Sequence, residues 1–212
     1  RALVGRLVRE REDRRILDRI AMVVADHRRL VPAAVDRLRI RRRIGAKPEI
    51  IVPVGRRERA AFCVGGLPVL KIGKEAFLYN ETLEKVTLPE GLESIESGAF
   101  GSCQKLVAVT LPRSLKRMSG CFTICSALEE VYLPDDSQLE VIDGMTFDFC
   151  PELWHFDFPA TLKVLNGSPF EEAGITTADP SRTQLTEVSG FRKCSKLKSV
   201  ILPPTLRAIG YL

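Results

Sequence analysis

The sequence predicts an α+β protein: a solenoid of stacked repeats with one short parallel strand in each, preceded by a basic helical extension that caps the first layer. Six phenylalanines recur at spacings of 21 to 25 residues in the 212-residue chain, and an internal repeat of this length is typical of solenoids. The charge is also divided, with a net +10 over residues 1–60 and −5 over residues 61–212. We therefore expect a basic helical extension over 1–48, a cap of short strands over 49–66, and a solenoid of about six repeats, the last incomplete, over 67–212.

The predicted extension is rich in arginine. Residues 1–60 hold 17 Arg and one Lys against four Asp and four Glu. Apolar residues recur at helical spacing through residues 1–31, Pro32 fits the first turn of a second helix, and Gly45 is a natural helix end. The helix dipole favours some of these cations near a C-terminus, but their number also suits contact with an acidic partner. We predict a basic docking patch formed by Arg37, Arg39, Arg41, Arg42, Arg43, Arg56, Arg57 and Arg59.

Two short strands are expected between this extension and the repeats. Glu49–Val54 and Ala60–Val64 are apolar runs with β-branched residues, and a basic turn joins them, which is typical of paired strands. A stack of repeats needs a cap over its first hydrophobic layer. We assign that role to these strands together with the preceding helices.

Each repeat places the same residue types at the same positions. A small residue, usually cysteine, follows each phenylalanine after three positions; in most units a leucine follows after six and a valine after nine. One unit cannot form a core alone, but stacked units bury these positions as continuous ladders. The Leu-x-x-Val-x-Leu part alternates like a strand, while the segment around the phenylalanine suits a helical turn or a short 3₁₀ piece. The repeated phenylalanines are Phe77, Phe100, Phe122, Phe147, Phe170 and Phe191.

The cysteines indicate buried thiols rather than a disulfide scaffold. Four of the six share one repeat position, which points inward in every copy, so we expect them to act as small apolar residues. Reduced thiols favour an intracellular compartment, including an organelle, over the cell surface. The four are Cys103, Cys125, Cys150 and Cys194.

The repeat pattern lapses between Phe158 and Val188. The unit that begins at Phe158 lacks its usual leucine and valine, and residues 174–180 stand in their place before the pattern recovers at Phe191. The sequence leaves two alternatives open, a bulging loop and a degenerate turn. Irregular segments on a rigid framework are common sites of function, although drift within a repeat has the same appearance.

No motif for catalysis or for metal or cofactor binding is present in the sequence. The chain has only two histidines, His27 and His155, and it lacks a glycine-rich phosphate loop or metal-ligand spacing. We therefore expect no enzyme activity and no catalytic, metal or cofactor residue, and no small-molecule substrate. No window approaches the roughly 18 uncharged apolar residues that a membrane-spanning helix needs.

Three segments, Ile72–Phe77, Leu88–Ile95 and Gly98–Cys103, resemble the BspA-type leucine-rich repeats. The resemblance covers about residues 67–212 and implies a leucine-rich repeat solenoid, a right-handed arc with a short strand in each turn. It also implies action by protein–protein contact without catalytic residues. Members of that family are often cell-surface adhesins, others are intracellular, and residues 1–60 lie outside the family pattern.

The repeat also locates an outward face. Strand alternation places the second residue after the core leucine, and the residue after the core valine, outside the core. Trp154, the only tryptophan, stands where no core ladder requires it; it covers either a partner or the irregular repeat beside it. Exposed Trp and Tyr are favoured contact residues. We predict a protein-binding face formed by Lys85, Glu130, Tyr132, Trp154, His155 and Asp157.

Together these patterns predict a non-enzymatic protein–protein interaction scaffold, a repeat subunit docked on other protein subunits of a larger assembly through its arginine-rich helices. Two alternatives stay open: a cell-surface adhesin-like protein, and an RNA-contacting accessory subunit of a ribonucleoprotein. The arginine density fits contact with the RNA backbone or another acidic surface. Base stacking is not expected, because no aromatic residue precedes Phe62.

Overall fold

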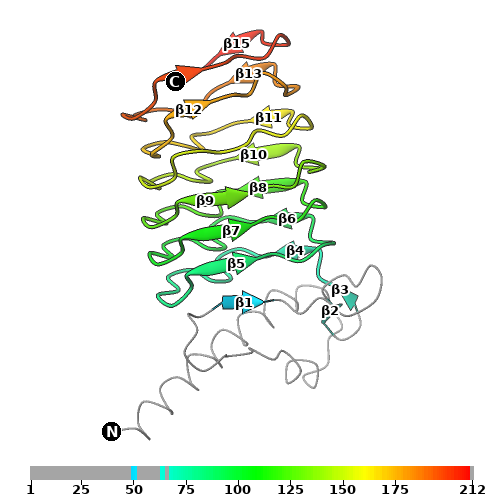
Figure 1. Cartoon of the computed structure of the whole chain (residues 1–212). Coiled ribbons are helices and arrows are strands. Elements are labelled where there is room, and N and C mark those ends of the chain that lie inside the picture. Colours follow the sequence, from blue (N-terminus) through cyan, green and yellow to red (C-terminus); the bar gives the residue numbers. More distant parts are fainter. Residues whose placement is uncertain (1–48, 52–62, 65–66, 211–212) are drawn as a thin grey trace, which may run out of the picture.

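The chain forms a parallel β-solenoid whose turns stack along one axis (Figure 1). The structure is a computed structural model that describes residues 49–51, 63–64 and 67–210. Most turns contribute two short strands, one to each of two sheets on opposite sides of the solenoid. The stacked-repeat prediction is confirmed, but the prediction of one strand per repeat is wrong. The second strand arises from the Leu-x-x-Ile segment, where apolar residues lie three apart and so do not show the alternation that marks a strand.

The first sheet carries Lys85, Glu130 and Tyr132 of the outward face predicted from the sequence. Its core side is a column of valines, Val86, Val109 and Val131, which are all buried. The neighbouring strands pair in register, so equivalent residues of successive turns lie side by side. In spatial order the strands are β1 (Glu49–Ile51), β5 (Lys85–Thr87), β7 (Ala108–Thr110) and β9 (Glu130–Tyr132).

The second sheet closes the opposite side of each turn and buries a column of Ile95, Met118 and Ile142. In chain order its strands are β4 (Lys71–Ile72), β6 (Ser94–Ile95), β8 (Arg117–Ser119), β10 (Val141–Asp143) and β11 (Val164–Leu165). Two strand pairs continue the stack, β12 (Thr177–Ala178) with β14 (Ser199–Val200) and β13 (Glu187–Val188) with β15 (Ala208–Ile209).

The predicted cap is described only in part. β1 extends the first sheet by pairing in parallel with β5, whereas β2 (Cys63–Val64) pairs antiparallel with β3 (Leu67–Pro68). In residues 49–51 and 63–64, the described parts of the two expected cap strands, each strand pairs with a segment of the repeats that follow and not with the other. The predicted helices over 1–48 lie outside the described residues.

The segments around the phenylalanines are successive β-turns, and no helix occurs in the part of the chain that the structure describes. Their amides alternate between two kinds of acceptor. Leu78 N donates locally to Glu75 O at 3.2 Å, while Phe77 N donates to Ala99 O of the next turn at 2.7 Å. A continuous helix would direct every donor along its own chain, so this alternation explains why the expected helical turn is absent.

The phenylalanine column forms the centre of the core. Rings of successive turns stack with centroids 4.9 to 5.6 Å apart and with interplanar angles of 3° to 22°. Five of the six rings are almost completely buried, from Phe100 to Phe191, while Phe77 at the start is half-buried. The aromatic ladder predicted from the spacing is confirmed.

The thiol column is confirmed as well. Cys103, Cys125 and Cys150 are buried, Cys194 is half-buried, and none of the cysteines in residues 69–210 forms a disulfide. Each thiol of the column lies against the carbonyl oxygen of a phenylalanine in the preceding turn, at S···O distances of 2.9 to 3.3 Å. Burial raises the pKa of Cys103 to about 12 and that of Cys194 to about 11, so these two thiols stay protonated at neutral pH and can donate to that carbonyl.

The irregular turn is a degenerate repeat rather than a bulging loop. Ile175 and Ala178 fill the places of the missing leucine and valine, and both are buried. Ile175 follows Phe170 by five positions, whereas the leucine of a regular turn follows its phenylalanine by six, so both residues stand one position earlier in the repeat. The shorter path brings Gly174 against the preceding turn, where a Cβ on Gly174 would lie 2.1 Å from Pro151 O. Only glycine fits so close an approach.

Two extra phenylalanines compensate for the small side chains of that turn. Phe156 and Phe158 stand where other turns carry valine and leucine, and their ring centroids lie 5.4 and 5.7 Å from that of Phe170. These larger side chains therefore pack against the phenylalanine of the shortened turn. Close packing of this kind is needed because unfilled core volume is destabilising.

Candidate protein-interaction face

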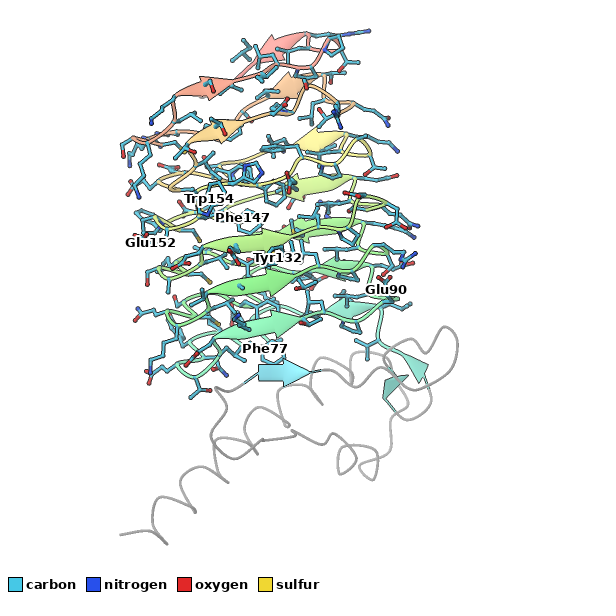
Figure 2. The ribbon with its side chains drawn as sticks, in the orientation of Figure 1. Phe77, Glu90, Tyr132, Phe147, Glu152 and Trp154 are labelled. Atoms are coloured by element: carbon cyan, nitrogen blue, oxygen red, sulfur yellow. The ribbon has the colours of Figure 1, made fainter. Side chains whose placement is uncertain are left out.

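Two large aromatic side chains project from neighbouring turns of the solenoid, one at the last strand of the first sheet and one in the turn that follows. Tyr132 and Trp154 are 51% and 55% exposed, and Figure 2 shows them on adjacent levels of the stack. Tyr132 follows the buried Val131 at the end of β9, so strand alternation directs it outward. Trp154 follows the buried Leu153 in the next turn. Neither ring is needed to fill the core.

Short polar contacts orient the residues around these rings. The Tyr132 hydroxyl donates to the Glu130 carboxylate, and this hydrogen bond raises the pKa of Tyr132. In the next turn His155 Nε2 lies 2.9 Å from Asp157 Oδ1. The Trp154 and His155 ring centroids are 5.3 Å apart. By repeat position, His155 and Asp157 match Glu130 and Tyr132, so the two pairs occupy equivalent places on adjacent levels.

The predicted strand at Trp154 is absent, which is a correction to the sequence analysis. Residues 154–158 form no strand in the structure, and the first sheet ends at β9 before β12 and β14 begin a separate pair. The interruption coincides with Phe156 and with the shortened turn above it, which changes the register between levels. The Trp154 backbone is nonetheless fixed, because Thr176 N donates to Trp154 O at 3.0 Å.

Carboxylates dominate the surface next to the two rings. Glu129 occupies the same repeat position as Trp154, one turn earlier, and it is exposed. Glu152 projects from the edge of the solenoid near Trp154 (Figure 2). We define the Trp154 patch as Glu129, Glu130, Tyr132, Trp154, His155 and Asp157, which contains three carboxylates and no lysine or arginine.

Lys85, the remaining residue of the predicted face, lies away from this patch. The register of the first sheet aligns Lys85 with Ala108 and Ala108 with Glu130. Lys85 is exposed, but the nearly buried Ala108 separates it from Glu130. The structure therefore brings five of the six predicted residues together. The eight arginines of the predicted docking patch, between residues 37 and 59, lie outside the described residues.

Sequence reasoning overlooked Glu129 as a member of the patch. Strand alternation assigns the first residue after the core leucine to the core side. At Glu129 that residue is exposed, because β9 begins only at Glu130 and Glu129 precedes the alternating strand. Trp154 at the same position was the available signal, because a tryptophan with no core role indicates that the position faces solvent.

The residues that the structure describes contain no group of three or more His, Cys, Asp or Glu placed to hold a metal ion. None of their elements is a helix with the length and apolar character to cross a membrane.

Comparisons with known proteins agree with this architecture. The T. pallidum leucine-rich repeat protein TpLRR matches with a TM-score of 0.61 and 25% identity, over 69% of each chain. A leucine-rich repeat protein from Bacteroides ovatus has a TM-score of 0.50 and 21% identity, over 76% of this chain and 47% of its own, and shows the fold alone. No curated protein matches the sequence.

A third solved structure, a leucine rich cell surface protein from Faecalibacterium prausnitzii, has a TM-score of 0.45 and 21% identity over 56% of this chain and 31% of its own. These comparisons lend no support to the predicted intracellular location, which stays a prediction.

The family comparison covers more than half of the sequence. The model of the BspA type leucine rich repeat region matches residues 70–189 in six copies. These residues hold five of the six column phenylalanines, three of the four column cysteines and the whole Trp154 patch. The chain belongs to the BspA-type leucine-rich repeat family.

Proposed function

We propose that the protein is a non-enzymatic interaction scaffold that binds a protein partner on the Trp154 patch. Membership of a leucine-rich repeat family is consistent with a protein-interaction scaffold. The observation that carries the proposal is the pair of exposed rings, Tyr132 and Trp154, on adjacent levels of a rigid stack. Tryptophan and tyrosine are enriched among residues that dominate binding energy, and a stacked array presents them without a large ordering cost.

Site-specific photo-cross-linking tests this proposal. A photoreactive phenylalanine analogue is placed at Tyr132 or Trp154 of the full chain, and at Val164 on β11 as a matched control. Val164 is also an exposed strand residue, but it belongs to the second sheet. We expect one protein to be captured at Tyr132 and Trp154 and not at Val164. Equal capture at all three positions would contradict the proposal.

We further propose that the arginine-rich segment docks the scaffold onto a larger assembly. The support is the charge division, +10 over residues 1–60 against −5 over the remainder. The full chain is compared with a variant in which Arg37, Arg39, Arg41, Arg42 and Arg43 are changed to Gln, using RNA, acidic vesicles and an acidic protein as probes.

Whichever of the three probes the full chain binds, the arginine variant should bind that probe more weakly. Contact with RNA phosphates additionally predicts an affinity that falls steeply and linearly on a log scale as salt increases, which would favour the RNA-contacting alternative over docking on protein. Identical binding of both chains to every probe would exclude the docking role.

A further inference from the structure

We infer that the Trp154 patch recognises a basic segment of its protein partner, seating an arginine or lysine side chain against Trp154 and Tyr132 with Glu129, Glu130 and Asp157 as counter-charges. This inference rests on the proposed function and adds the chemistry of the partner to it.

The arrangement of charges points to a cationic partner. Three carboxylates surround the two rings, and the equivalent positions in the flanking turns carry no positive charge. On the level below they are the uncharged Val107, Ala108 and Thr110, and on the level above they are Thr176, Thr177 and a further carboxylate, Asp179. The positions of the patch and their equivalents in the flanking turns therefore carry carboxylates and no lysine or arginine. The ammonium group of Lys196 reaches the turn of Trp154 at Pro151 O, to which it donates at 3.0 Å.

The aromatic rings add a second preference for cations. The faces of Trp and Tyr rings attract Arg and Lys side chains that approach within about 6 Å of the ring centroid. The Glu130 carboxylate accepts the Tyr132 hydroxyl hydrogen, so the phenol oxygen is directed along the face toward its own strand. Exposed carboxylates next to an exposed indole thus present two kinds of cation-binding group within one patch.

The same features argue against an acidic partner. A nucleic acid or an acidic membrane surface would bring phosphates against Glu129, Glu130 and Asp157, and like charges placed opposite one another cost several kcal/mol at an interface. A basic protein segment meets no such penalty. Residues 1–60 of this chain, with their net charge of +10, are an example of a protein segment with this composition.

The test uses the single tryptophan as its own reporter. Trp154 is the only tryptophan of the chain, so emission from the full-length protein reports on this patch alone. Hexa-arginine, hexa-lysine and hexa-glutamate peptides are titrated at low and high salt. We expect the two basic peptides to change the emission saturably, with an affinity that falls as salt increases, and hexa-glutamate to have no effect.

A matched pair of variants locates the binding. The Glu129→Gln, Asp157→Asn double variant should lower the affinity for hexa-arginine by about tenfold or more, as expected for the loss of charged interface partners. Asp135→Asn, an exposed carboxylate on the connection that leaves β9, should leave the affinity unchanged. Trp154→Ala, followed by calorimetry because it removes the reporter, should also weaken binding, whereas its melting temperature should stay close to that of the parent.

Each outcome decides the inference. If residues 1–60 of the chain already occupy the patch, the emission of the protein alone will shift with salt and with the double variant, which also supports recognition of a basic segment. The inference is wrong if neither the basic peptides nor salt change the tryptophan emission. It is also wrong if hexa-glutamate binds as tightly as the basic peptides, or if Asp135→Asn lowers the affinity for hexa-arginine as much as the double variant does.

The cross-linking experiment separates this failure from failure of the proposed function. A protein captured at Trp154 in the absence of any basic-peptide effect would show that the scaffold role holds and that the partner chemistry is wrong. No capture at Tyr132 or Trp154 would remove the scaffold proposal itself.

Discussion

Individual residues on the turns adopt a backbone conformation that side chains rarely tolerate. The second residue after each phenylalanine has a positive φ, with values of 58° at Tyr79, 60° at Ile124 and 53° at Phe149. A bulky or β-branched residue in this region is unusual. The conformation turns the amide toward the next level, where Ile124 N donates to Asp148 O at 2.8 Å. The side chains of all three point into solvent as a result.

Asp148 is the one buried carboxyl group with an incomplete set of hydrogen bonds among the described residues. It is 4% exposed, and its Oδ1 atom has no hydrogen-bond partner. Burial, together with the nearby carboxylates of Glu171 and Glu172, raises the pKa of Asp148 from 3.8 to about 6, and the ammonium group of Lys193 opposes the shift only in part.

This raised pKa predicts a loss of stability between pH 4 and pH 7. The folded state binds the proton more tightly than the unfolded chain, so the stabilising contribution is complete below about pH 4 and is lost as the pH rises through 6. Asp148→Asn removes this dependence. Relative to the parent, the variant should gain up to about 3 kcal/mol in free energy of unfolding between pH 4 and pH 7.5.

Urea unfolding of both chains across this pH range measures the difference. Asp135→Asn, which changes an exposed carboxylate, is the control and should follow the parent at every pH. Parallel curves for the parent and Asp148→Asn would show that Asp148 does not carry the pH dependence.

At the scale of elements, the phenylalanine column predicts a sharp contrast between two neighbouring rings. Phe147 is fully buried and stacks on Phe122 and Phe170, while Phe149 is 45% exposed. Phe147→Ala should lower the free energy of unfolding by about 3–5 kcal/mol, and Phe100→Ala should do the same. Phe149→Ala should cost less than about 1 kcal/mol. Denaturant unfolding of the three variants checks this, and an unchanged melting temperature for both buried rings would refute the ladder.

The shortened turn makes its own prediction. Gly174→Ala would place a methyl group 2.1 Å from Pro151 O, a backbone atom that cannot move aside alone. We expect a loss of about 3 kcal/mol or more, since the two turns must separate locally. Gly101→Ala is the control, because its closest contact is the flexible tip of the Leu78 side chain at 2.8 Å. Equal thermal stability of the two variants would mean that the close approach is not required.

The elements that the sequence predicted are those whose residues recur at fixed positions. The phenylalanine and thiol columns were found because identical side chains return in each copy. Ile175 and Ala178 were hidden by a one-residue shift and by a change of residue type. At the Trp154 patch, the aromatic residues could be inferred because no ladder required them. The exposure of Glu129 could not, because it depends on where β9 begins, and that is set by contacts between levels.

At the scale of the whole molecule, charged side chains form columns along one edge of the stack. Lys116 Nζ lies 3.0 Å from Glu93 Oε1, and Lys163 Nζ lies 2.9 Å from Glu140 Oε1. These four residues share one repeat position, so the charge alternates in sign from level to level. All four side chains are about half exposed, so each pair adds little stability. The alternation instead disfavours any stacking in which like charges face each other.

This column predicts a salt-dependent effect of charge reversal. Lys116→Glu places a third carboxylate between Glu93 and Glu140 and should lower the free energy of unfolding by about 0.5–1 kcal/mol at low salt. The loss should shrink at about 1 M salt, where the Debye length is about 3 Å. Lys105→Glu, an exposed residue of the neighbouring repeat segment, serves as the control. A loss that is independent of salt would point to packing rather than charge.

The constant stacking distance of the phenylalanine rings bears on how such a chain can change over generations. Ring centroids in successive turns stay 4.9 to 5.6 Å apart, although the units differ in length by up to four residues. Differences in length are taken up outside the column, so a duplicated gene segment encoding one complete turn would join the stack without disturbing its neighbours. Each such duplication would lengthen the first sheet by one row, and the outward surface could then diverge by substitution alone.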